Sequence, residues 1–127
     1  MTINELVEQA HETATEKGWY DKPKTFGELI AHCHSELSEA LEDFREGCSP
    51  RRSGFRCQGE ERDQDLCGGN CHSCEMYKPV GIPIELADVV IRVADLCGHH
   101  GIDLETAIKR KMEYNKTRPY RHGGKVI

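Results

Sequence analysis

With 127 residues, 37% of them hydrophobic and 6% aromatic, the chain suits one small domain whose thin supply of core residues favours association between subunits. Its net charge of −5 disfavours stable nucleic-acid binding, although a bound metal ion would still allow a single nucleotide to bind. No apolar run is as long as a membrane span and the N-terminus lacks a signal-peptide pattern, so we expect a cytoplasmic protein without a membrane partner.

The first half of the chain predicts two helices. Apolar residues recur at helical spacing over residues 2–17, and Gly18 ends that run. Thr25 and Glu28 form a capping-box pattern, so a second helix should begin after Thr25 and end at Gly47.

Residues 48–80 interrupt this helical pattern. They show no apolar periodicity and contain five of the seven cysteines, so we interpret them as an inserted Cys-rich loop or knuckle. In a reducing compartment such a cluster favours a metal site over disulfides, and four thiolates suit a structural Zn²⁺ ion. Free thiols or a redox-sensitive disulfide are the alternative. The predicted ligands are Cys57, Cys67, Cys71 and Cys74, with Cys48 or His72 as alternates.

The second half predicts two more helices and a basic tail. Pro83 is a favourable first-turn residue for a third helix that should reach about His99. Asp103 can cap a fourth helix over residues 104–117, which should stop before Pro119. No strand-like alternation stands out. The prediction is therefore an all-α, four-helix bundle in one domain, with the Cys-rich insertion between its second and third helices.

Two acidic pairs carry the functional signal. Glu36 and Glu39 are three residues apart, as are Glu85 and Asp88, so each pair faces one way on its helix. The second pair stands in the apolar stretch 82–97, where an uncompensated carboxylate is costly. We expect that helix to be buried on most sides, with its polar stripe facing a cavity, a metal or a partner.

A shared metal ion would compensate both pairs. Oxygen ligands suit Mg²⁺ or Mn²⁺, whereas di-iron carboxylate bundles use Glu-x-x-His motifs. For the second helix alone, a solvated acidic face is the alternative. A polyphosphate bound to Mg²⁺ also needs cations, and the fourth helix and tail supply them, unless they only complement the helix dipole. The basic residues are Lys109, Arg110, Lys111, Lys116, Arg118, Arg121 and Lys125.

In order, these motifs resemble the MazG-like nucleotide pyrophosphohydrolases, within the all-α NTP pyrophosphatase superfamily. The resemblance is carried by HSELSEAL at residues 34–41, ELAD at 85–88, KMEYNKTR at 111–118 and HGGK at 122–125. It covers most of the chain except residues 48–80. It implies a bundle completed in a homodimer or homotetramer, and Mg²⁺-dependent cleavage of a nucleoside or deoxynucleoside triphosphate to the monophosphate and pyrophosphate.

The resemblance also implies roles for individual residues. The catalytic, metal-binding carboxylates match Glu36, Glu39, Glu85 and Asp88, and which of them orients the attacking water stays open. The positions expected to contact phosphate, sugar or base match Lys111, Asn115, Arg118, Lys125, His34 and Trp19. A core or interface role is the alternative for Trp19.

Two other functions stay open at this point. One is a non-catalytic, zinc-binding regulatory or interaction protein on the same bundle. The other is an enzyme like phosphoribosyl-ATP pyrophosphatase. A complete set of acidic and basic motif residues argues against loss of catalysis, while the sequence specifies neither the base nor the sugar.

Overall fold

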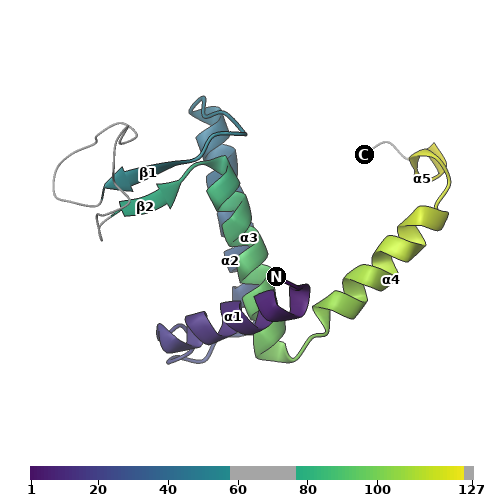
Figure 1. The fold of residues 1–127 in the computed structure, drawn as a ribbon, viewed down its shortest axis with the longest axis horizontal. Helices are drawn as coiled ribbons and strands as arrows, with labels where there is room; N and C mark the ends of the chain where they lie inside the picture. Colours follow the sequence, from purple (N-terminus) through teal and green to yellow (C-terminus); the bar gives the residue numbers. More distant parts are fainter. Residues whose placement is uncertain (58–76, 125–127) are drawn as a thin grey trace. The chain divides into compact units, whose positions relative to one another are not determined.

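The computed structural model describes residues 1–57 and 77–124. Most of them are helical, which confirms the predicted helical class. The long helices are α1 (Ile3–Glu16), α2 (Phe26–Arg45), α3 (Ile82–His100) and α4 (Leu104–Thr117), and a short α5 (Arg121–Gly124) follows (Figure 1). None of the helices in these ranges is long and apolar enough to cross a membrane.

Local capping explains where the helices begin. The Thr25 hydroxyl accepts a hydrogen bond from the Glu28 backbone N–H at 3.2 Å, and the Glu28 carboxylate accepts one from the Thr25 N–H at 2.6 Å. These two bonds satisfy backbone donors that the first turn of α2 leaves open. The Asp103 carboxylate likewise accepts from the Thr106 N–H at 3.0 Å at the start of α4. The predicted boundaries of both helices are therefore confirmed.

The structure adds two short strands in a stretch where the sequence shows no strand-like alternation. β1 (Gly54–Cys57) and β2 (Tyr77–Val80) pair as an antiparallel hairpin, one strand on each side of residues 58–76, and are drawn at the left of Figure 1. Gly54 is opposite Val80, and Cys57 is opposite Tyr77. Four residues are too few to show a clear alternation of apolar and polar side chains.

The chain divides into two compact units, and we describe each by itself. One unit, Pro23–Val93, contains α2, the hairpin and the first three turns of α3. Its buried apolar side chains are Leu29, Ala40 and Ile82. The hairpin leads directly into α3, because Gly81 follows β2 and its carbonyl accepts hydrogen bonds from the N–H groups of Ile84 and Glu85.

The other unit combines Met1–Lys22 with Ala94–Ile127. It contains α1, the last turns of α3, and α4. Asp95 is buried, and its carboxylate lies 2.9 Å from Nδ1 of His11 on α1. The ring of Tyr20, in the turn after α1, stacks on the ring of His99 with centroids 4.1 Å apart. These contacts hold the end of α3 against α1.

Gly98 lets α1 and α3 approach closely, and this predicts the effect of a small substitution. A Cβ at residue 98 would lie 2.6 Å from the His11 Cβ and 3.2 Å from the Val7 carbonyl oxygen. Gly98→Ala should therefore lower the free energy of unfolding by about 1–3 kcal/mol, measured by urea denaturation. Gly27→Ala, at an exposed helical site with no atom closer than 4.0 Å, should leave stability unchanged or raise it by up to about 1 kcal/mol. A Gly98→Ala protein as stable as the wild type would contradict this close packing.

Burial of α3 on most sides is not observed in the described chain. Leu86, Val90 and Ile91 are 45%, 53% and 43% exposed. On α2, large apolar side chains are also exposed. By their spacing, Leu37, Leu41 and Phe44 share one side of α2, and Leu86 and Val90 share one side of α3. We call these five side chains, together with Ile91, the apolar face of Pro23–Val93.

Candidate metal centre

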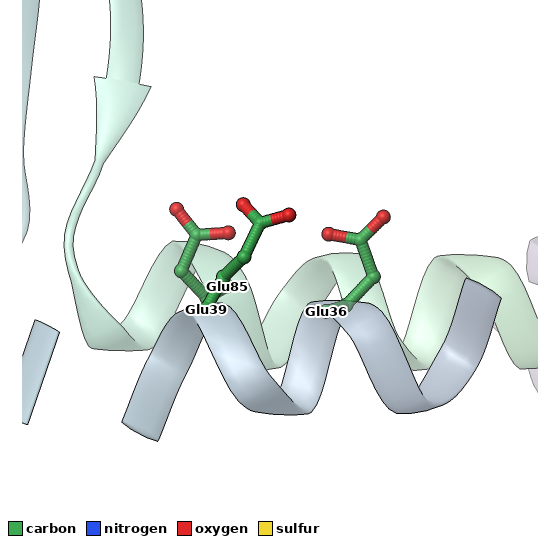
Figure 2. Close-up of side chains that lie close together, drawn as sticks. All are labelled: Glu36, Glu39 and Glu85. Atoms are coloured by element: carbon green, nitrogen blue, oxygen red, sulfur yellow. The ribbon is translucent and has the colours of Figure 1, made fainter. Parts of the chain in front are cut away.

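Three of the four predicted carboxylates come together within the unit Pro23–Val93. Glu36 and Glu39 project from neighbouring turns of α2, and Glu85 projects from the first turn of α3. Figure 2 shows all three carboxylates on the same side of the two helices. One oxygen from each lies within 4.8 Å of one oxygen from the other two.

The three carboxylates differ in their exposure to water. Glu85 is buried, with 7% of its surface exposed. The Glu36 side chain is 12% exposed, and Glu39 is exposed. Within residues 1–57 and 77–124, the Glu85 carboxylate accepts no hydrogen bond and forms no ion pair. The charged residues that act on this buried carboxylate are Glu39, Lys78, Asp88 and Asp43.

This surrounding raises the pKa of Glu85 above its ordinary value. The main cause is desolvation by burial, because the charged form loses contact with water. Repulsion from Glu39, Asp88 and Asp43 acts in the same direction, whereas the positive charge of Lys78 on β2 lowers the pKa. The site thus holds excess negative charge that a cation would stabilise.

Gly81 sets the path of the backbone into the first turn of α3, which carries Glu85. It has a φ of +110°, and a Cβ there would lie 2.8 Å from the Arg52 carbonyl oxygen. Only glycine fits such a close approach with a left-handed backbone. The position of the first turn of α3, and hence of Glu85, therefore depends on the packing of Gly81 against the segment before β1.

Asp88 does not join the other three. It is half-buried on α3, and it is near enough to raise the pKa of Glu85, but its oxygens lie outside the group of three. The sequence rule that Glu85 and Asp88 face one way is therefore only approximate in the described structure.

The sequence places Arg92 on the polar stripe of the third helix, but sequence reasoning gave this residue no role at the cluster. Arg92 on α3 donates a hydrogen bond from Nε to Oε1 of Glu36 at 3.0 Å. Arg92 belongs to the same polar stripe as Glu85, seven residues further along. Seven residues bring a helical position back to within about 20° of the first, and this spacing was the signal available in the sequence.

The predicted substrate-binding residues lie on other elements. His34 is exposed on α2, one turn before Ser38, whose hydroxyl donates to the His34 carbonyl oxygen. Lys111 and Asn115 are exposed on α4, and Arg118 is the half-buried residue that ends this helix. Trp19 is half-buried in the turn after α1. Lys125 lies outside the described residues.

Most of the predicted zinc ligands also lie outside the described residues. Cys67, Cys71, Cys74 and the alternate His72 fall in residues 58–76, which the structure does not describe. Cys57 is the last residue of β1, and Cys48 is exposed after α2. The zinc site stays a prediction.

The donor set of the three carboxylates fits a hard divalent cation. All ligands are oxygens, which suits Mg²⁺ or Mn²⁺ better than Zn²⁺. A cation beside a buried carboxylate with a raised pKa would lower that pKa and stabilise the ionised form. Glu36, Glu39 and Glu85 are the residues that could hold such an ion.

The raised pKa of Glu85 predicts how stability changes with pH in metal-free buffer. The folded chain holds the Glu85 proton more tightly than the unfolded chain does, so its contribution is fully present below the unfolded value of 4.5. That contribution is lost as pH rises through the folded pKa. As pH rises from 4.5 to neutrality, the melting temperature of the wild type should therefore fall relative to that of Glu85→Gln. The control is Glu42→Gln, at an exposed position on α2. A difference for Glu85→Gln that changes with pH no more than the difference for this control would contradict the raised pKa.

Comparison with protein-family models, curated proteins and solved structures found no match. The functional assignment therefore depends on the chemistry of the residues themselves and on the resemblance of the motifs.

Proposed function

We propose that this protein is a Mg²⁺-dependent pyrophosphohydrolase that cleaves nucleoside or deoxynucleoside triphosphates to the monophosphate and pyrophosphate. The observation that carries the proposal is the buried Glu85 carboxylate beside Glu36 and Glu39. The ordered motifs that resemble the MazG-like family supply the substrate class. Mn²⁺ would satisfy the same oxygen ligands.

In this proposal Glu36, Glu39 and Glu85 hold the cation, and Asp88 adds negative charge close to them. The bound ion would neutralise phosphate charge and lower the pKa of the attacking water. One of the carboxylates orients that water, since a carboxylate oxygen is a good hydrogen-bond acceptor.

The basic side chains would bind the oxygens of the substrate. Lys111 and Arg118 carry the charge needed to stabilise the leaving pyrophosphate. Asn115 offers both a donor and an acceptor for the sugar. His34 and Trp19 are the proposed contacts for the base, and Lys125 is a further phosphate contact. These roles come from the motif resemblance.

We also propose that the protein is a homodimer or homotetramer. The support is the apolar face of Pro23–Val93, whose large side chains are about half exposed in the single chain. A soluble monomer rarely leaves several such side chains together in water, and a second copy of the chain is the partner implied by the resemblance. No further partner protein and no nucleic acid is needed for the proposed reaction.

One panel of assays tests the proposed reaction. Each common NTP and dNTP, and phosphoribosyl-ATP, would be incubated with the purified protein with Mg²⁺ or with EDTA, and released pyrophosphate and monophosphate would be quantified. We expect turnover of at least one nucleoside triphosphate, equal amounts of the two products, and none in EDTA. Turnover of phosphoribosyl-ATP alone would assign the related enzyme instead. No turnover of any nucleotide would overturn the proposal and favour the non-catalytic binding protein.

A further inference from the structure

Among the described residues, Arg92 is the positively charged neighbour of the acidic cluster at hydrogen-bonding distance. Arg92 Nε lies 3.0 Å from Oε1 of Glu36, and the two side chains are 31% and 12% exposed. An arginine is charged at every physiological pH. Because both groups are largely withdrawn from water, this pair is screened less than a surface pair.

The geometry of the pair leaves half of the Glu36 carboxylate available. The hydrogen bond joins Arg92 to a single oxygen, Oε1. A carboxylate has a second oxygen and further lone pairs on the first. Arg92 therefore restricts the rotation of Glu36 while leaving its second oxygen, Oε2, able to accept from or bind another group.

The cluster is thus asymmetric. Glu36 is held by a fixed cation, whereas the buried Glu85 carboxylate has no hydrogen-bond or ion-pair partner among the described residues. Carboxylates that bind metals are commonly oriented by a hydrogen bond to their other oxygen. Glu36 has such a bond before any metal binds, and Arg92 provides it from the same helix as Glu85.

We propose that Arg92 is a positioning residue of the metal centre, which orients the Glu36 carboxylate so that its second oxygen binds the divalent cation. This inference rests on the proposed function, because it takes the cluster to be a metal site. It assigns to Arg92 no contact with the substrate. Its effect on the cation passes through Glu36.

The test is the affinity for Mn²⁺ alone, measured by calorimetry or electron paramagnetic resonance without nucleotide. Arg92→Met keeps most of the side-chain volume and removes the donor and the charge, and should weaken Mn²⁺ binding by about 10- to 100-fold. Arg92→Lys keeps the charge but not the planar Nε donor, so its Mn²⁺ affinity should lie between that of the wild type and that of Arg92→Met. The matched control is Arg45→Met, because Arg45 is exposed on α2 and is 3.6 Å from Glu42. That variant should bind Mn²⁺ as the wild type does.

A double-substitution cycle separates positioning from a general structural role. Once Glu36→Gln is in place, Arg92→Met should cause no further loss of Mn²⁺ affinity, because the group that Arg92 orients has been changed. An additional tenfold loss in the double variant would overturn the proposal. If circular dichroism shows that Arg92→Met does not fold, the Mn²⁺ affinity of Arg92→Lys becomes the test. An affinity equal to that of the wild type would then overturn the proposal.

The outcomes also distinguish this inference from the proposed enzyme activity. Unchanged or tighter Mn²⁺ binding in Arg92→Met would overturn the role of Arg92 and leave the pyrophosphohydrolase proposal standing. Mn²⁺ binding that depends on Arg92, in a protein that hydrolyses no nucleotide, would support Arg92 and overturn the activity. A wild type that binds no Mn²⁺ would overturn both.

Discussion

Glu85→Gln is expected to lower the rate of Mg²⁺-dependent pyrophosphate release by at least about 10²–10³-fold while raising the melting temperature of the metal-free protein. Both effects have one physical cause. The carboxylate is buried beside Glu39 and Asp88, and its pKa is raised by desolvation and by their repulsion. Glutamine has the same shape without the charge, so the folded chain no longer carries that cost. The same substitution removes an anionic ligand from the cation.

The measurement pairs initial rates of pyrophosphate release with thermal unfolding in EDTA. Glu39→Gln should lose activity to a similar degree with a smaller gain in stability, because Glu39 is exposed to water. The control is Glu42→Gln, whose side chain is 62% exposed on the same helix as Glu39. It should change neither quantity. A Glu85→Gln protein that is fully active would show that the three carboxylates are not the catalytic centre.

The second large effect concerns association. Val90→Glu is expected to raise the dissociation constant of the homo-oligomer by at least about 30-fold, which is the effect typical of substituting a residue at the centre of an interface. Val90 is 53% exposed in the single chain, so a charge there costs the isolated fold little. In an interface the same charge would be buried without a partner. Sedimentation should show the variant at the monomer mass of 14.4 kDa, at concentrations where the wild type is a dimer or tetramer.

An apolar-to-acidic change outside the unit Pro23–Val93 provides the control. Ile102 is 40% exposed between α3 and α4, and Ile102→Glu should leave the oligomeric state as it is in the wild type. A wild-type protein that sediments as a monomer at all concentrations would contradict the proposed oligomer. It would also leave the apolar face without its proposed partner.

The helices could be predicted from the sequence because their signals are local. Thr25 with Glu28, and Asp103 with Thr106, satisfy backbone donors within one turn, so their residue types alone mark where α2 and α4 begin. The hairpin could not be predicted in this way. The pairing of Cys57 with Tyr77 joins residues separated by residues 58–76, and each strand is only four residues long.

The candidate site could be predicted in part. Three of the four expected carboxylates meet, yet the sequence assigned Asp88 to the group and left Arg92 out. Around an ideal helix Asp88 lies about 60° from Glu85, whereas Arg92 lies about 20° from it. The choice between them depends on how α3 is rotated against α2, and spacing within one helix does not contain that information.

The hairpin also has a consequence for how this chain can vary. Cys57 and Tyr77 are paired across the two strands, so the backbone leaves the described fold and returns to it at neighbouring points. We therefore expect that residues 58–76 can be shortened, lengthened or exchanged without altering the register of β1 and β2 or the start of α3. A chain in which a two-residue turn replaces residues 58–76 should keep the arrangement of the three carboxylates. Metal binding by thiolates and metal binding by carboxylates could then be measured separately.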